Sequence, residues 1–148
     1  MDLRFLNSLY EIRLAVEPAA SALAALRRSE ESLARMRALI DEFRQPGHTR
    51  STFAEVDLAL HLEIAAASGN PFMRSVGAII EAALMASFVD SSPVTDQGRL
   101  SHSTEDHAAI VEAIAVRDAT AAAQAMTQVI EEGRRNRALL LEAGKDNR

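Results

Sequence analysis

The sequence predicts an all-α protein folded as an antiparallel bundle of six to seven helices. Apolar residues recur every three or four positions along most of the 148-residue chain, which places them on one face of a helix. Alanine, the best helix former, occurs 28 times, whereas the aromatic residues that favour strands make up only 4%. The predicted helices are joined mostly by short turns, and short turns make consecutive helices antiparallel neighbours.

The N-terminal third of the chain predicts two helices. An apolar stripe covers residues 9–26 and contains Pro18, which lacks an amide donor and is expected to cause a kink or a restart. Ser29 is the predicted N-cap of the second helix, because its side-chain oxygen can accept a hydrogen bond from a first-turn amide. The stripe of this second helix covers residues 33–43 and ends before the proline and glycine at 46–47.

The middle of the chain predicts two more helices. Ser51 or Thr52 can cap the first of them, whose apolar stripe covers residues 53–64. The Ser-Gly-Asn-Pro sequence at 68–71 indicates that this helix ends and another begins, since glycine suits a helix end and proline a first turn. The stripe of the fourth helix covers residues 72–84.

The last third of the chain predicts a long loop and two helices. Residues 90–100 contain a proline and a glycine and form the longest predicted loop. Ser103 is the predicted N-cap of the fifth helix, and Asp118 is the predicted N-cap of the sixth. Gly133 is expected to loosen the sixth helix, and the polar residues 144–148 are expected to fray.

Composition and charge exclude several classes of protein. The chain carries 16 basic and 21 acidic residues, so it has no broad cationic surface with which to grip DNA phosphates. It has no cysteine, which excludes disulfides, thiolate metal sites and a cysteine nucleophile. Without an apolar run of ~18 residues or a signal-peptide layout, the protein is expected to be cytoplasmic, with no membrane span. We predict one helical domain over residues 1–143 and a tail over 144–148.

Asp57 and His61 interrupt an apolar stripe and are therefore predicted to be buried. Each lies three or four positions from apolar residues of the 53–64 stripe, and the two are one helical turn apart. A buried carboxylate is costly unless it is paired or bound to a metal. The two residues can therefore be a hydrogen-bonded pair within the core, or they can supply one oxygen and one nitrogen to a cation.

His107 extends this pair to a candidate metal site. It lies three positions before Ile110 and seven before Ile114, so it faces the interior of the fifth predicted helix. In an antiparallel bundle, the third and fifth helices can direct Asp57, His61 and His107 to one point. Such a set of one oxygen and two nitrogens suits zinc, nickel, manganese or iron and does not choose among them. The alternative is that His107 only caps or packs locally in the first turn of its helix.

Arg13 and Asn70 are the other candidate binding residues. Arg13 lies inside the first apolar stripe, and arginine is rarely buried without a partner. It can form an i,i+4 salt bridge with Glu17, or its guanidinium can bind a carboxylate or phosphate group of a ligand. Asn70 is suited to capping a helix, and its amide can also line a cavity.

Three segments of the sequence contain the polar residues described above and follow one another in order along the chain. They read LYEIRLAVEPAASALAA at residues 9–25, DLALHLEIAAASGNPFM at residues 57–73 and EDHAAIVEAIAVRDATAAAQAM at residues 105–126. Together they resemble the FCD ligand-binding domain, the C-terminal sensory module of FadR-type transcription regulators in the GntR superfamily. The resemblance covers nearly the whole chain, and three motifs in order are more specific than any one of them.

The resemblance implies an all-α bundle of six or seven helices with a cavity for small organic acids. In many members an aspartate and three histidines hold a divalent metal at the floor of this cavity. Asp57, His61 and His107 match three of these four ligands. Arg13 matches an arginine that commonly helps to bind the acid, and Asn70 matches the asparagine of the Ser-Gly-Asn motif.

The chain departs from the family pattern at one ligand position. The last histidine of the family usually follows a methionine by three positions, and here Val129 stands three positions after Met126. The fourth ligand is therefore missing. Three protein ligands can still hold a metal, with water or the effector at the open positions, or the site can work without metal.

These observations lead to one functional expectation and two alternatives. The chain is expected to be the effector-binding and dimerisation domain of a bacterial GntR-family regulator, forming a homodimer that senses a small carboxylate metabolite. No catalytic step is needed, and DNA would be reached only through a winged helix-turn-helix, which this sequence does not contain. The alternatives are a metal-dependent hydrolytic enzyme on a helical bundle and a stand-alone helical interaction module. The enzyme is disfavoured because no spare general base stands near the cluster in sequence.

Overall fold

The computed structural model describes residues 3–79, 82, 83, 85, 86 and 96–146, which form six helices and no strand. The prediction of an all-α bundle is confirmed. The six helices are α1 (Leu3–Arg27), α2 (Glu30–Phe43), α3 (Arg50–Ala67), α4 (Pro71–Ile79), α6 (Gln97–Ala115) and α7 (Ala119–Asp146).

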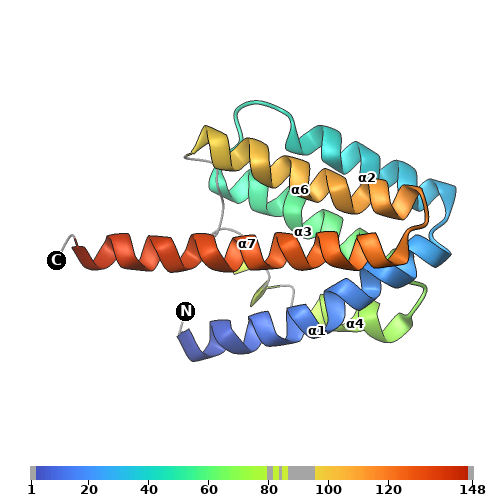
Figure 1. Ribbon diagram of the computed structural model, residues 1–148, viewed down its shortest axis with the longest axis horizontal. Coiled ribbons are helices and arrows are strands. Elements are labelled where there is room, and N and C mark those ends of the chain that lie inside the picture. Colours follow the sequence, from blue (N-terminus) through green and yellow to red (C-terminus); the bar gives the residue numbers. More distant parts are fainter. Residues whose placement is uncertain (1–2, 80–81, 84, 87–95, 147–148) are drawn as a thin grey trace.

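The two longest helices, α1 and α7, pack antiparallel to each other, so the start of α1 and the end of α7 lie on the same side of the molecule (Figure 1). On the other side of α7 lies α6, which also packs against α2. Helix α3 packs against both α1 and α2, and the short helix α4 packs against α3. This arrangement places α1 in contact with α3 and with α6, the helices that carry the candidate metal ligands.

The hydrophobic core lies between these helices and is built from the predicted stripes. Phe43 and Phe53, from α2 and α3, meet edge to face with ring centroids 5.1 Å apart. Ala24 and Ala25 of α1 and Ala122 of α7 have no exposed surface and belong to this core, and α1 and α7 pack against each other. The alanine-rich composition thus serves close helix packing as well as helix propensity.

Two of the predicted N-caps are confirmed. The hydroxyl oxygen of Ser29 accepts a hydrogen bond from the Ser32 amide at 3.0 Å, at the start of α2. The carboxylate of Asp118 accepts one from the Ala121 amide at 3.0 Å, at the start of α7. In both places a polar side chain of the predicted type satisfies an amide that the helix leaves without a partner.

Two other predicted helix starts are wrong. Helix α3 is capped by Thr49 rather than by Ser51 or Thr52, although Thr52 completes a capping box with Thr49. Helix α6 is capped by Asp96, two turns before the predicted Ser103. The physical reason for the second difference is that Asp96 caps locally and that Leu100, in the first turns of α6, packs against the core. Residues 97–100 of the predicted loop are therefore helical.

Helices α1 and α7 continue through the proline and the glycine at which the sequence predicts a disturbance. Helix α1 runs without interruption through Pro18, so the proline does not cause a restart, and the helix is visibly curved (Figure 1). Helix α7 continues through Gly133 to Asp146, so residues 144–146 of the predicted tail are helical. Residues 90–95 of the predicted loop and Ile80 and Leu84 of the fourth stripe lie outside the described residues.

A buried arginine joins the ends of two helices. The Arg28 side chain donates hydrogen bonds to the carbonyl oxygens of Ala115 at 2.8 Å and Ile114 at 3.4 Å, at the C-terminus of α6. Arg117, just after α6, in turn donates to the Leu26 carbonyl oxygen of α1 at 3.2 Å. Each guanidinium thus satisfies carbonyl groups that a helix end leaves without partners.

We expect Arg28→Ala to lower the free energy of unfolding by about 2 kcal/mol, because hydrogen bonds from a charged donor to buried carbonyl groups are lost. Urea denaturation followed by circular dichroism measures this change. Arg35→Ala is the control, since the Arg35 side chain is 58% exposed in its pair with Glu63 and should cost less than ~1 kcal/mol. Equal effects of the two substitutions would contradict the role given to Arg28.

Candidate metal and effector site

Helices α3 and α6 bring Asp57, His61 and His107 together in the interior. The three residues are 9%, 4% and 3% exposed, respectively. Oδ1 of Asp57 lies 3.1 Å from Nε2 of His61 and 2.9 Å from Nε2 of His107. One ligand atom from each residue lies within 4.8 Å of the others. The spacing of one turn between Asp57 and His61 gives both side chains the same buried face of α3.

The second nitrogen of each histidine ring faces a hydrogen-bond acceptor. Nδ1 of His107 donates to the carbonyl oxygen of Ser103 at 2.7 Å, one turn earlier in α6. Nδ1 of His61 pairs with Oε1 of Glu17, which comes from α1. Histidines that bind metals usually hold their other ring nitrogen in this way, because the bond fixes the orientation of the ring. The oxygen and the two Nε2 atoms therefore fit a divalent cation.

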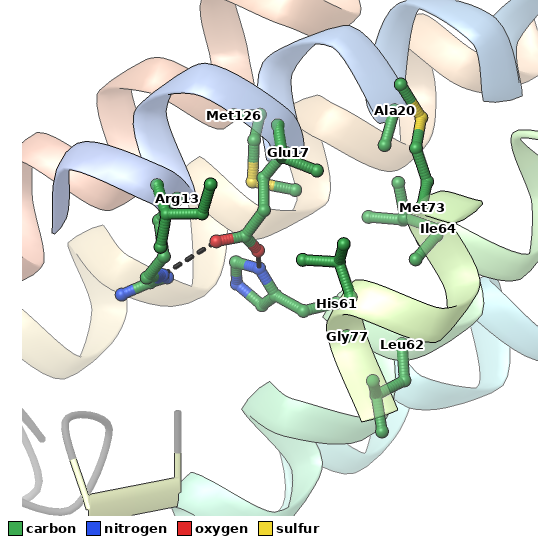
Figure 2. Close-up of a pocket in the computed structure, with 13 residues that line it drawn as sticks. Arg13, Glu17, Ala20, His61, Leu62, Ile64, Met73, Gly77 and Met126 are labelled. Atoms are coloured by element: carbon green, nitrogen blue, oxygen red, sulfur yellow. Dashed lines mark hydrogen bonds and ion pairs between the residues drawn. The ribbon is translucent and has the colours of Figure 1, made fainter. Parts of the chain in front are cut away.

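Glu17 extends the cluster to Arg13. Nε of Arg13 donates to Oε2 of Glu17 at 2.6 Å, and the Arg13 side chain is 3% exposed (Figure 2). The i,i+4 salt bridge considered from the sequence is therefore present. The Arg13 guanidinium carbon also lies 5.7 Å from the centre of the Tyr10 ring. These contacts form a continuous row from Arg13 through Glu17, His61 and Asp57 to His107.

The contacts along the row shift the pKa values of Glu17, Asp57 and His61. Burial alone would raise the pKa of Glu17, but the charges of Arg13 and His61 outweigh burial and lower this pKa from 4.5 to about 2. Burial is likewise outweighed at Asp57, where His107 and His61 hold the carboxyl pKa well below its usual range. For His61, burial would lower the pKa, but Glu17 and Asp57 raise it from 6.5 to about 9. The surroundings of His61 thus favour positive charge.

A small cavity of about 30 Å³ adjoins this row. Arg13, Glu17 and His61 form its polar end (Figure 2). The other described residues that line it are apolar or glycine and come from α1, α3, α4 and α7: Ile12, Val16, Ala20, Leu62, Ile64, Ala65, Met73, Val76, Gly77 and Met126. A space of this volume holds water molecules rather than an organic acid.

Asn70 and Val129 are not among the described residues that line the cavity. Asn70 caps α4, since its Oδ1 accepts a hydrogen bond from the Phe72 amide at 2.9 Å. Val129 is buried in the core on α7, one turn after the cavity residue Met126. Its apolar side chain offers no donor atom at the position where the resemblance places a histidine.

Glu17 is the residue whose importance the sequence interpretation missed. It was considered only as a salt-bridge partner of Arg13. A usable signal was nevertheless present, because Glu17 lies four positions after Arg13 and three before Ala20, on the face of α1 that is buried. A second stripe-breaking charge on the same face predicts a second buried polar partner.

Fold and site together define an all-α domain with an internal cavity beside oxygen and nitrogen atoms that are suited to bind a metal ion. The FCD domain family matches residues 8–132, and the chain belongs to this family. The resemblance noted from the three motifs is therefore confirmed.

The chain is similar to a transcriptional repressor and to a solved GntR structure. The galactonate operon transcriptional repressor of Escherichia coli (strain K12) is 27% identical over 129 residues, which are 87% of this chain and 56% of that protein. The structure of Streptococcus agalactiae GntR is similar with a TM-score of 0.75 and 27% identity, over 89% of this chain and 59% of that chain. The chain therefore spans less than two thirds of either relative.

Similarity to a third protein, at lower sequence identity, supports the fold alone. The structure of E. coli McbR/YncC is similar with a TM-score of 0.72 and 18% identity, over 96% of this chain and 70% of that chain. Among the residues that the structure describes, no helix combines the length and the apolar character that crossing a membrane requires.

The pKa shifts predict how the stability of the chelator-treated protein depends on pH. The lowered pKa of Glu17 stabilises the fold above pH 4.5, and this contribution is lost as the pH falls through about 2. The raised pKa of His61 stabilises the fold below pH 6.5, and this contribution is lost as the pH rises through about 9. The urea midpoint, measured with EDTA across this range, should therefore be highest between pH 4.5 and 6.5.

His61→Gln isolates the alkaline part of this prediction, because glutamine does not titrate. The variant should lose the decline above pH 6.5, whereas His102→Gln, at a residue whose side chain is 62% exposed, should keep it. A His61→Gln protein that declines as steeply as the parent would show that His61 does not cause the decline.

Proposed function

We propose that the chain is the effector-binding and dimerisation domain of a bacterial GntR-family transcription regulator, sensing a small carboxylate in a metal-floored cavity. The observation that carries this proposal is the convergence of Asp57, His61 and His107 directly beside a cavity whose polar end also contains Arg13. Membership of the FCD family and regulatory relatives support the regulatory role. DNA would be bound by a winged helix-turn-helix, for which the greater length of the relatives leaves room.

In this proposal Asp57, His61 and His107 hold a divalent cation such as zinc, nickel, manganese or iron. The cation supplies positive charge and open coordination positions for an anionic group. Arg13 supplies the second positive charge at the same end of the cavity. Binding changes regulation only if the ligand has different affinities for two arrangements of the dimer.

The apolar walls indicate the chemical class of the effector. A hydroxyl group that enters a cavity lined by alkyl side chains leaves its water partners and loses about 1–3 kcal/mol if it finds no new one. We therefore expect an acid with a hydrocarbon body rather than a polyhydroxylated sugar acid. Helix α4 is the wall most able to move and make room, since none of its described residues is buried, in contrast to the core-forming helices α3 and α6.

Removing a ligand should remove the cation site. Asp57→Ala and His107→Ala should each weaken Zn²⁺ binding by roughly 100-fold, since outer-sphere losses alone reach that size. Isothermal titration calorimetry measures the affinity, and elemental analysis of protein purified without added metal identifies the natural ion. His102→Ala is the control, because His102 is exposed and pairs with Asp106. Unchanged Zn²⁺ affinity in both Asp57→Ala and His107→Ala would refute the site.

The effector class can be tested with a matched pair of acids. Hexanoate and gluconate have the same number of carbons and one carboxylate each, but only gluconate carries hydroxyl groups along its chain. Hexanoate should raise the melting temperature of the protein more than gluconate at equal concentration.

Arg13→Met should remove the shift caused by hexanoate, because the anchoring guanidinium is lost. A shift retained in this variant would rule out Arg13 as the anchor. A larger shift with gluconate than with hexanoate would overturn the predicted effector class. If neither acid nor a wider panel of small carboxylates shifts the melting temperature, the sensor function itself is wrong.

A further inference from the structure

Glu17 contacts both Arg13 and the candidate cation ligand His61. Its side chain is 16% exposed, and its two oxygens have different partners. Oε2 accepts from Nε of Arg13 at 2.6 Å, within α1. Oε1 pairs with Nδ1 of His61, which lies on α3 and 44 positions away in sequence. Figure 2 shows the carboxylate between the guanidinium and the imidazole ring.

We propose that Glu17 is a positioning residue that holds the His61 ring ready to bind a cation and ties this ring to Arg13. The inference rests on the cation site of the proposed function. Glu17 is not itself one of the grouped ligands, which are Asp57, His61 and His107. It lies at Nδ1 of His61, whereas Nε2 of the same ring faces Asp57. Its effect on the cation must therefore pass through the ring.

The orientation of the His61 ring is what Glu17 controls. An imidazole ring can turn about its bond to the Cβ atom, and a turn of half a circle would direct carbon atoms at Asp57 and Glu17. The hydrogen bond from Nδ1 to a carboxylate opposes this turn and makes Nε2 a more basic ligand. His107 has an equivalent bond to the Ser103 carbonyl of its own helix. At Nδ1, the His61 ring is therefore held by a side chain from another helix, whereas the His107 ring is held by the backbone of its own helix.

Arg13 is subordinate to Glu17 in this arrangement. Removing Arg13 leaves the contact between Glu17 and His61 in place, so the cation site should be largely retained. Removing the charge of Glu17 changes both sides, since a glutamine carbonyl can serve His61 only weakly and its amide cannot accept from Arg13. The two substitutions therefore separate a positioning role from a salt bridge that only stabilises the fold.

The test measures Zn²⁺ binding to the full chain by isothermal titration calorimetry. Glu17→Gln should weaken binding by roughly 10–100-fold, the range known for outer partners of metal-binding histidines. Glu63→Gln is the matched control, because the Glu63 side chain is 18% exposed and pairs with Ser32 and Arg35 instead. Arg13→Met should have a clearly smaller effect than Glu17→Gln.

A spectroscopic measurement distinguishes positioning from loss of stability. In the Zn²⁺-loaded parent, the Nδ1 proton of His61 should resonate far downfield, as a proton bonded to a carboxylate does. The resonance should move upfield in Glu17→Gln and stay in place in Glu63→Gln. If Glu17→Gln does not fold, Glu17→Asp replaces it, because this residue keeps the charge but cannot reach both partners, and it should also bind Zn²⁺ more weakly.

The outcomes separate this inference from the proposed function. Zn²⁺ binding that is lost in Asp57→Ala but equal in Glu17→Gln and Glu63→Gln would overturn the role of Glu17 and leave the cation site intact. An unmoved Nδ1 resonance would overturn it as well. Zn²⁺ binding that Asp57→Ala does not weaken would refute the cation site, and the inference would fall with it.

Discussion

A row of ionisable side chains in the interior joins three helices and forms the polar centre of the candidate site. Its members are Arg13, Glu17, His61, Asp57 and His107, from α1, α3 and α6. Placing single charges in the interior costs several kcal/mol per ion unless a partner of opposite sign is close. Basic and acidic groups alternate along this row, so each member offsets the burial of its neighbours. Removing one member leaves each of its neighbours with one partner fewer.

The two ends of the row have different surroundings, and only one of them lines the cavity. At one end, His107 is fixed to the backbone of its own helix through Ser103, so this end is rigid. At the other end, Arg13 and Glu17 reach the cavity. An otherwise apolar cavity thereby receives one polar end, which is the pattern of a pocket that orients a small ligand. The same polar end adjoins the donors that suit a cation.

Local signals predicted the class of the fold and two helix caps, whereas the starts of α3 and α6 were missed because another residue nearby is the cap and, for α6, because Leu100 packs against the core. Ser29 and Asp118 were predictable as caps because a cap bonds to residues two or three positions away. The start of α6 was missed because Leu100 is held by the core, which a reading of the local sequence does not include. The class of the fold was predicted from periodicity and composition, and neither changes when a helix boundary shifts by one or two turns.

Within the candidate site, too, the sequence predicted the contacts within one helix and missed one that depends on the packing of two helices. Asp57 and His61 could be paired from the sequence because they lie one turn apart on one helix. His107 could be added to this pair because it lies on the apolar face of its own helix, which is expected to face the core. The second partner of Glu17 could not be found in this way, because His61 is 44 positions distant and the contact exists only when α1 packs on α3.

Under the proposed function, the row also determines how ligand binding at Arg13 would change the positions of the helices. Two side-chain contacts join the helices in the row, between Glu17 and His61 and between Asp57 and His107. A ligand that binds at the Arg13 end therefore acts first on α1, and α1 lies along much of α7. A change in the position of α1 relative to α3 would alter the surface formed by α1 and α7. The ligand can favour such a change only if it binds more tightly to one position of α1 than to the other.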